Sequence, residues 1–301
     1  MKNRLETDLV GIKMKNPILL ASGTCGFGEE LSELFDIDKL GGMCFKGLTL
    51  LPSGGNEGIR IWETPSGIMN SIGLENPGVD VFIKDIYPTI ANRDFVKIVN
   101  VGGHSESDYI EALKKLNTID IDFVELNISC PNVKEGGMNF GLKTKSATQF
   151  VEKMRNICKK KMIVKLSPNA ENIVELAMGC EKVGTDSISL VNTFQAMAID
   201  IKKKKPVFKN IYAGLSGPAI KPIALRMVHQ VSQEVKIPII AVGGIMTFED
   251  VIEYIMAGAT CCQIGVASFI NPKVSLEIIS GLEQYLIDNE YNSLQEIRKI
   301  L

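Results

Sequence analysis

The chain has 301 residues, a formal net charge of −2, and 45% hydrophobic against 23% charged residues. This is ordinary globular composition, with enough apolar residues for a large buried core. The charge balance argues against a nucleic-acid-binding protein, which usually carries a basic surplus. No apolar run is long enough to span a membrane, and residues 1–16 lack the core of a signal peptide, so we expect a cytoplasmic protein.

The cysteines are dispersed and form no CxxC pair, at positions 25, 44, 130, 158, 180, 261 and 262. An odd, scattered set in a large chain is typical of reduced thiols and not of a disulfide framework. The spacing also predicts no zinc or iron–sulfur site in this chain. Because His104 and His229 are the only histidines, acid–base chemistry has to rely on other groups.

Eight short apolar runs predict β-strands over residues 17–22, 42–48, 95–101, 121–129, 161–167, 186–192, 239–243 and 260–266. Helical periodicity separates most of them and is clearest over 219–235. Ser105 with Asp108, and Thr247 with Asp250, predict capping boxes at two helix starts. Strands that alternate with helices indicate a parallel α/β architecture.

Eight strands favour a closed (β/α)₈ TIM barrel over an open doubly wound sheet. No linker rich in proline, glycine or serine interrupts the chain, so residues 1–301 are expected to form a single domain. Two connections are unusually long, residues 49–77 after the second strand and 193–218 after the sixth. Both would leave the carboxyl ends of strands, where we expect binding loops or lids; decorative insertion is the alternative.

Six of the predicted strands end in a polar side chain and two end in glycine: Ser22, Lys46, Asn100, Asn127, Lys165, Asn192, Gly243–Gly244 and Gly265. Buried polar groups need partners, so this convergence predicts a polar ligand across the mouth of the barrel. Glycine at the ends of the seventh and eighth strands favours a phosphate site there, although tight turns alone would also use glycine.

Three ionisable groups stand out at these strand ends. Strand alternation places Lys46 on the face of Cys44, and Lys165 on the face of Ile163, inside the barrel. Two lysines there suit an anionic ligand or a negative charge that develops during a reaction. One alternative is that a lysine forms a Schiff base with the substrate. Another is that the lysine side chains extend outward and place their ammonium groups in solvent. Cys130, just past the fourth strand, is either a general base or an ordinary buried thiol.

Several segments resemble the dihydroorotate dehydrogenases, flavin enzymes of pyrimidine biosynthesis, and the resemblance covers nearly the whole chain. The segments are KNPILLASG at 15–23, MNSIGLENPG at 69–78, ELNISCPNV at 125–133, VKLSPN at 164–169, GLSGPAIKP at 214–222 and VGGI at 242–245. ELNISCPNV together with VKLSP is the most specific. The cysteine in NISCPN, KEGG at 134–137 and GLSGPAIKP are most similar to the NAD-linked class 1B catalytic (FMN) subunit. The quinone-linked class has a serine base and an N-terminal membrane segment, and this sequence shows neither.

The resemblance implies oxidation of (S)-dihydroorotate to orotate in UMP biosynthesis. Cys130 would remove a proton from C5 while a hydride passes from C6 to N5 of FMN, and Lys165 would stabilise negative charge near the flavin N1 and C2 carbonyl. The implied FMN-binding residues are Ser22, Lys46, Gly47, Asn100, Asn127, Lys165, Val191, Gly217, Gly243, Gly244, Gly265 and Val266. The implied substrate-binding residues are Lys46, Asn70, Ser71, Ile72, Gly73, Leu74, Asn127, Asn132, Asn192 and Thr193.

The NAD-linked class works with a second subunit that carries FAD and a [2Fe–2S] cluster, and a homodimer flanked by two such subunits forms a heterotetramer. The sequence departs from the family pattern with KGLT at 46–49 for KATT, and with GVA at 265–267 for GTA, which removes a hydroxyl from the expected phosphate site. The alternatives are a fumarate-linked homodimeric relative, a Schiff-base aldolase that uses Lys165, and a tRNA-reducing flavin enzyme.

Overall fold

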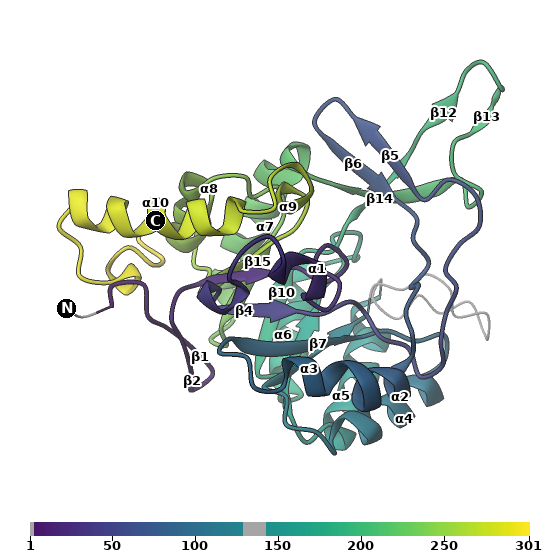
Figure 1. The fold of residues 1–301 in the computed structure, drawn as a ribbon, viewed down its shortest axis with the longest axis horizontal. Coiled ribbons are helices and arrows are strands. Elements are labelled where there is room, and N and C mark those ends of the chain that lie inside the picture. The colour runs from purple at the N-terminus through teal and green to yellow at the C-terminus, as the bar shows by residue number, and fades with distance from the viewer. Residues whose placement is uncertain (1–2, 129–142) are drawn as a thin grey trace.

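The computed structural model describes residues 3–128 and 143–301. Its centre is a closed barrel of eight parallel strands (Figure 1). These are β3 (Ile18–Leu20), β4 (Gly42–Cys44), β7 (Val96–Val101), β8 (Phe123–Asn127), β9 (Lys161–Lys165), β10 (Ser187–Leu190), β15 (Ile239–Val242) and β16 (Cys261–Ile264). Each strand lies within one of the eight predicted runs, so the TIM-barrel prediction is confirmed.

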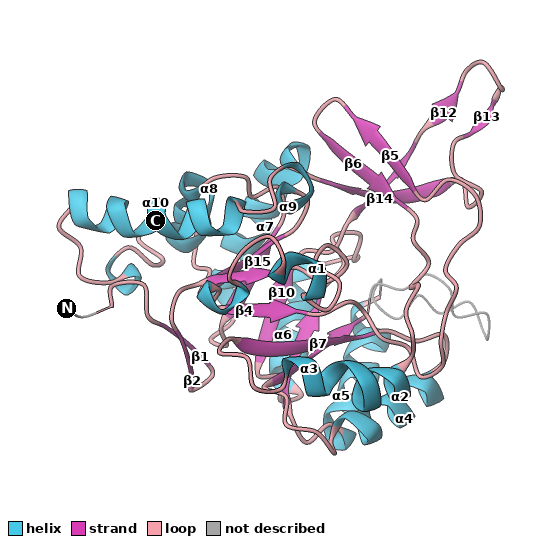
Figure 2. Cartoon of the chain, viewed as in Figure 1, coloured by secondary structure: helices cyan, strands magenta, loops and turns pink. Residues whose placement is uncertain are grey.

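Helices surround the barrel (Figure 2). The longer ones are α4 (Glu106–Leu116), α5 (Thr144–Ile157), α6 (Ile173–Lys182), α7 (Lys221–Glu234), α8 (Phe248–Met256) and α10 (Val274–Asp288). Single turns are α1 (Glu29–Ser32), α2 (Val79–Val81), α3 (Tyr87–Ile90) and α9 (Ala267–Ile270), with further 3₁₀ or π turns at Ile37–Lys39, Phe82–Ile86, Pro218–Ile220 and Leu294–Glu296. No helix in the described ranges combines the length and apolarity needed to cross a membrane.

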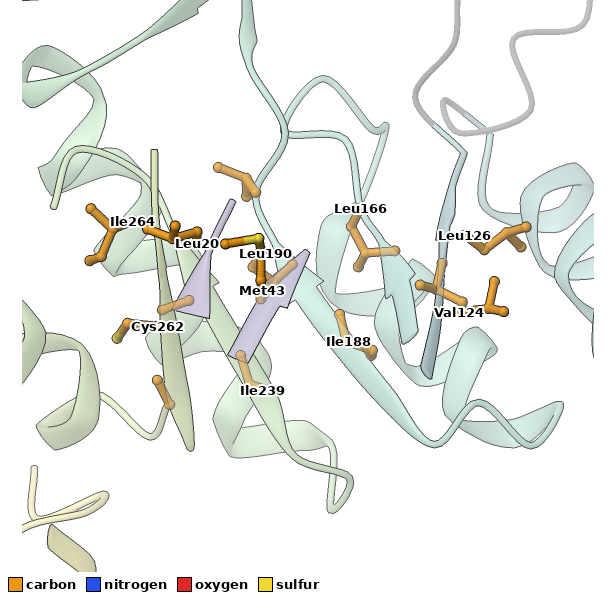
Figure 3. Close-up of a cluster of buried hydrophobic side chains, with 14 of the residues drawn as sticks. Leu20, Met43, Val124, Leu126, Leu166, Ile188, Leu190, Ile239, Cys262 and Ile264 are labelled. Atoms are coloured by element: carbon orange, nitrogen blue, oxygen red, sulfur yellow. The ribbon is translucent and has the colours of Figure 1, made fainter. Parts of the chain in front are cut away.

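Alternation along each strand divides the core into two faces. The outward side chains, such as Leu20 and Val124, pack beneath the helices (Figure 3). The inward side chains form a separate apolar layer at the amino ends of the strands, which consists of Leu19, Cys44, Val96, Ile98, Phe123, Ile163, Ile240 and Cys261. The hairpin of β1 (Thr7–Leu9) and β2 (Ile12–Met14) packs against this layer through Leu9 and Met14. Cys44 and Ile163 therefore face inward, as predicted.

The two long connections pair with each other. Residues 49–77 contain β5 (Ile61–Thr64) and β6 (Gly67–Asn70), and residues 193–218 contain β11 (Phe194–Met197) and β14 (Tyr212–Ser216). They form one antiparallel sheet in the order β11-β14-β6-β5, which extends from the barrel in Figure 1. A smaller hairpin of β12 (Ile199–Asp200) and β13 (Lys205–Pro206) carries an exposed lysine-rich tip.

Both predicted capping boxes are present. The Asp250 carboxylate accepts hydrogen bonds from the N–H groups of Met246 (2.7 Å) and Thr247 (3.0 Å), and it pairs with Lys221 of α7. Burial opposes the charged carboxylate, but Lys221 and the two backbone donors hold the pKa of Asp250 below its usual value. Asp250 therefore ties the start of α8 to the start of α7.

We expect Asp250→Ala to lower the free energy of unfolding by about 1–2 kcal/mol at neutral pH, the usual cost of a lost cap. Because the folded-state pKa of Asp250 is lowered, its contribution is present above the ordinary value of 3.8 and is lost as the pH falls through the folded-state value. Urea unfolding at neutral and acidic pH tests this. Glu249→Ala, an exposed change in the same turn, is the control and is expected to be nearly neutral.

Candidate active site

A cavity of about 770 Å³ opens at the carboxyl ends of the barrel strands. Its lining includes every polar or glycine strand end that the sequence singles out: Ser22, Lys46, Asn100, Asn127, Lys165, Asn192, Gly243, Gly244 and Gly265. Residues of the added sheet, among them Asn70 and Gly214, form another wall. The predicted convergence on one mouth of the barrel is confirmed.

A buried carboxylate lies beneath the cavity. Glu125, in the middle of β8, has no exposed surface. Its Oε1 accepts hydrogen bonds from Asn100 Nδ2 (2.7 Å) and Cys44 Sγ (3.2 Å). Its Oε2 accepts from Ser189 Oγ and Gln263 Nε2, both at 2.9 Å. The inward face of the barrel therefore changes from an apolar layer to a polar one just below the site.

The positive charge of Lys165 completes this polar layer. Lys165 Nζ lies 3.5 Å from Glu125 Oε1 and 3.4 Å from Ser22 Oγ. Only 5% of the Lys165 residue is exposed. The ammonium group thus sits between a buried anion and the rim, and it forms a cationic patch in the cavity floor.

Glu125 was not among the site residues predicted from the sequence. The signal was present, because Phe123, Glu125 and Asn127 alternate on one face of a strand whose other face is apolar. An ionisable side chain at an inward position of a central barrel strand is unusual, because such positions are normally filled by branched apolar residues.

Glycines shape another part of the cavity wall. Gly244 has a φ of 67°, and a Cβ on it would lie 2.7 Å from Lys221 Cβ and 2.9 Å from the Gly217 carbonyl oxygen. The Tyr254 hydroxyl donates to the Gly243 carbonyl oxygen at 2.6 Å and fixes the turn from outside. With Gly265, these residues make a backbone-lined concavity that suits an anion such as phosphate.

Amide side chains line the remaining wall. Asn192 Nδ2 donates to Asn127 Oδ1 at 3.2 Å, and the Thr193 N–H donates to Asn192 Oδ1 at 2.8 Å. From the added sheet, Asn70 Nδ2 donates to the Gly214 carbonyl oxygen at 3.3 Å. These contacts bring β8, β10, β6 and β14 together, so the wall can recognise a small ring with several hydrogen-bonding groups.

Comparison with known proteins identifies the family. The family model for dihydroorotate dehydrogenase matches residues 4–286. The chain is 56% identical over 296 residues to dihydroorotate dehydrogenase B (NAD(+)), catalytic subunit, of Petrotoga mobilis, covering 98% of this chain and 99% of that protein. The proteins of the same name from Caldicellulosiruptor bescii and Bacteroides thetaiotaomicron are 48% and 47% identical, each over 97% of both chains.

The chain belongs to the dihydroorotate dehydrogenase family.

The site residues that the family resemblance implies fall almost entirely on this cavity. All of them line it except Cys130 and Asn132, which lie outside the described residues. Gly47, Val191 and Val266 are among the lining residues, as is the run from Ser71 to Leu74. His104 also lines the cavity.

The described cysteines do not offer a base at neutral pH. All six of them are buried. Burial raises the pKa of the Cys25 thiol to about 12, and burial together with Glu125 raises that of Cys44 well above its usual value. Within residues 3–128 and 143–301, no cluster of histidine, cysteine and carboxylate side chains could hold a metal ion.

Proposed function

We propose that this chain is the cytoplasmic catalytic subunit of an NAD-linked enzyme that oxidises (S)-dihydroorotate to orotate, with FMN held in the barrel mouth. One observation carries the proposal: a single cavity has a buried lysine in its floor, a glycine concavity and an amide wall. The names of the relatives, which specify dihydroorotate dehydrogenase B (NAD(+)), support the choice of substrate and acceptor.

The residues present fit FMN. Gly243, Gly244, Gly265 and Val266 would bind the phosphate through backbone N–H groups, an arrangement that needs no side-chain hydroxyl at Val266. Gly217 would be a further FMN contact. Lys165 would lie near N1 and the C2 carbonyl of the ring, with Ser22, Lys46, Gly47, Asn100, Asn127 and Val191 as further contacts. When bound, FMN supplies a two-electron acceptor for the hydride.

The amide wall and the loop at Ser71–Leu74 would hold the substrate. Asn70, Asn127 and Asn192 present donors and acceptors that match the pyrimidine ring, with Thr193 and Asn132 beside them. Lys46, on the same rim as Lys165, would contact both the substrate and the flavin. These residues would orient C6 toward the acceptor and C5 toward the base.

Cys130 would act as that base and take the C5 proton. In the sequence it is the third residue after Asn127, the last residue of β8, the strand that also carries Glu125. The buried thiols of Cys25 and Cys44 are poor bases because of their raised pKa values. This leaves Cys130 as the thiol whose position in the chain favours proton transfer.

The electrons would pass to a partner subunit. We propose a homodimer of this chain with two partners that carry FAD and a [2Fe–2S] cluster, because the relatives are named as catalytic subunits of an NAD(+)-linked enzyme. This chain has no clustered cysteine motif with which to hold such a cluster itself.

Anaerobic titration of the purified chain with dihydroorotate tests the proposal. We expect yellow FMN absorbance that bleaches on addition of dihydroorotate, and NAD⁺ reduction only after the partner is added. Rapid fumarate reduction by the chain alone would instead favour the fumarate-linked alternative. A colourless chain that borohydride links to a substrate through Lys165 would favour the aldolase.

Gly244→Ala is expected to weaken FMN binding, because the added methyl group meets Lys221 and the Gly217 carbonyl and φ is positive. We expect the dissociation constant of FMN to rise by about tenfold or more, measured by titrating apoprotein with FMN. Gly54→Ala is the matched control, since a Cβ there meets nothing within 4 Å. Equal FMN affinity in both variants would contradict the phosphate role of Gly244.

A further inference from the structure

The carboxylate of Glu125 gathers donors from five other barrel strands. They are Cys44 of β4, Asn100 of β7, Lys165 of β9, Ser189 of β10 and Gln263 of β16. Barrel interiors are normally filled by layers of branched apolar side chains, and the layer directly below is of that kind. A charged side chain at this depth therefore calls for a reason other than packing.

Packing alone would be served as well by an apolar side chain. Removing a carboxylate from water is unfavourable, and pairing it with a lysine commonly does no more than offset that cost. A hydrophobic residue of similar volume would fill the same space without it. The charge of Glu125 is therefore best explained by its interactions with the side chains that donate to it.

Three of the five donors face the active site. Asn100, Lys165 and Gln263 line the cavity, whereas Glu125 does not. Lys165 has the longest and most flexible side chain of the three, and its ammonium lies between Glu125 Oε1 at 3.5 Å and Ser22 Oγ at 3.4 Å. Glu125 can therefore influence a ligand in the cavity through these three side chains and not by direct contact.

Glu125 and Lys165 form a buried ion pair. Burial alone would disfavour the charged carboxylate, but Lys165 and the hydrogen bonds from Gln263 and Asn100 hold the pKa of Glu125 below its usual value. Cys44 stays a neutral donor, because burial and the nearby carboxylate raise its pKa.

We propose that Glu125 is a positioning residue of the active site, which holds the charged ammonium of Lys165 at the cavity floor beneath the bound ring. This inference rests on the proposed function, because it assigns the ammonium to negative charge on a reduced flavin. The carboxylate and the ring then lie on opposite sides of the same cation. Without the carboxylate, the buried ammonium of Lys165 lacks a counter-ion, which disfavours the ammonium in that position.

Glu125→Gln tests this, because glutamine matches glutamate in size and lacks the charge. The probe is sulfite, whose sulfur lone pair forms a bond to N5 of an oxidised flavin and leaves negative charge over N1 and the C2 carbonyl. The adduct bleaches the visible flavin absorbance, so its dissociation constant is measured on the FMN-loaded chain without substrate or partner. We expect sulfite to bind about tenfold more weakly or worse in Glu125→Gln.

Ser189→Ala is the matched control, since it removes one hydrogen bond from the same carboxylate and leaves both charges in place. Ser189 does not line the cavity. We expect its sulfite affinity to stay within about twofold of the wild type. If the role of Glu125 were purely structural, both variants would only lower the free energy of unfolding. The sulfite affinity of the folded protein would then be unchanged in both.

Unchanged or tighter sulfite binding in Glu125→Gln would overturn the proposal. The rate of flavin reduction by dihydroorotate gives a second measurement and is expected to fall in the same variant. If Glu125→Gln does not fold, Glu125→Asp tests the proposal in its place. The shorter aspartate side chain keeps the negative charge but moves it away from the Lys165 ammonium. We expect about threefold weaker sulfite binding there, and wild-type affinity would refute the role. A wild-type chain without flavin absorbance would refute the proposed function before any variant is compared.

Discussion

Cys130→Ser is expected to slow dihydroorotate oxidation by about a hundredfold to ten-thousandfold at neutral pH, the range that a positioned base contributes. A thiol with a reference pKa of about 8.5 is close enough to neutrality to accept a proton, whereas a serine hydroxyl is a far poorer base. FMN should stay bound, because the proposed flavin contacts do not include Cys130. Stopped-flow measurement of flavin reduction by dihydroorotate tests the prediction directly.

Cys158→Ser is the control for that experiment. Cys158 is buried at the end of α5, and its thiol contacts the Lys160 carbonyl oxygen, a bond that a hydroxyl can keep. We expect wild-type rates of flavin reduction in this variant. Equal rates in Cys130→Ser and the wild type across the pH range would remove Cys130 from the mechanism.

Lys165→Ala is expected to lower the rate of flavin reduction by about a hundredfold or more, in line with the loss of one preorganised group that stabilises developing charge. It should also destabilise the fold by about 3–5 kcal/mol, because Glu125 would remain buried without its cation. Retention of FMN should weaken as well. The reduction rate is therefore measured in excess FMN, and the free energy of unfolding is measured separately.

Lys161→Ala provides the matched comparison. Lys161 lies on the same strand and face as Lys165 but at the amino end, where its ammonium donates to the Val10 carbonyl oxygen. We expect some loss of stability and no change in the rate of flavin reduction. Wild-type flavin binding and reduction in Lys165→Ala would refute the role proposed for Lys165.

Much of the barrel was predictable because its signals are local. Apolar runs such as residues 161–167 and 260–266 mark strands by themselves, and Thr247 with Asp250 marks a helix start within four residues. The polar residues at the strand ends were predicted from the same apolar runs, because they stand where each run stops. In a parallel barrel every strand ends at one rim, so residues far apart in the chain meet there once the fold class is known.

The added sheet was decided by the tertiary structure. Residues 49–77 and 193–218 were recognisable as long connections, but their sequences do not say that β6 pairs with β14. That pairing joins Asn70 to Gly214 across the mouth of the barrel. It depends on closure of the barrel first bringing the two connections to the same end.

Local patterns were enough to predict the eight strands, their polar ends and the motifs of the family. The place of Glu125 beneath the cavity, where it holds Asn100, Lys165 and Gln263 together, became apparent in the folded barrel. The physical reason is that a buried charge is stable only with its partners, and here those partners come from strands that closure of the barrel alone makes neighbours.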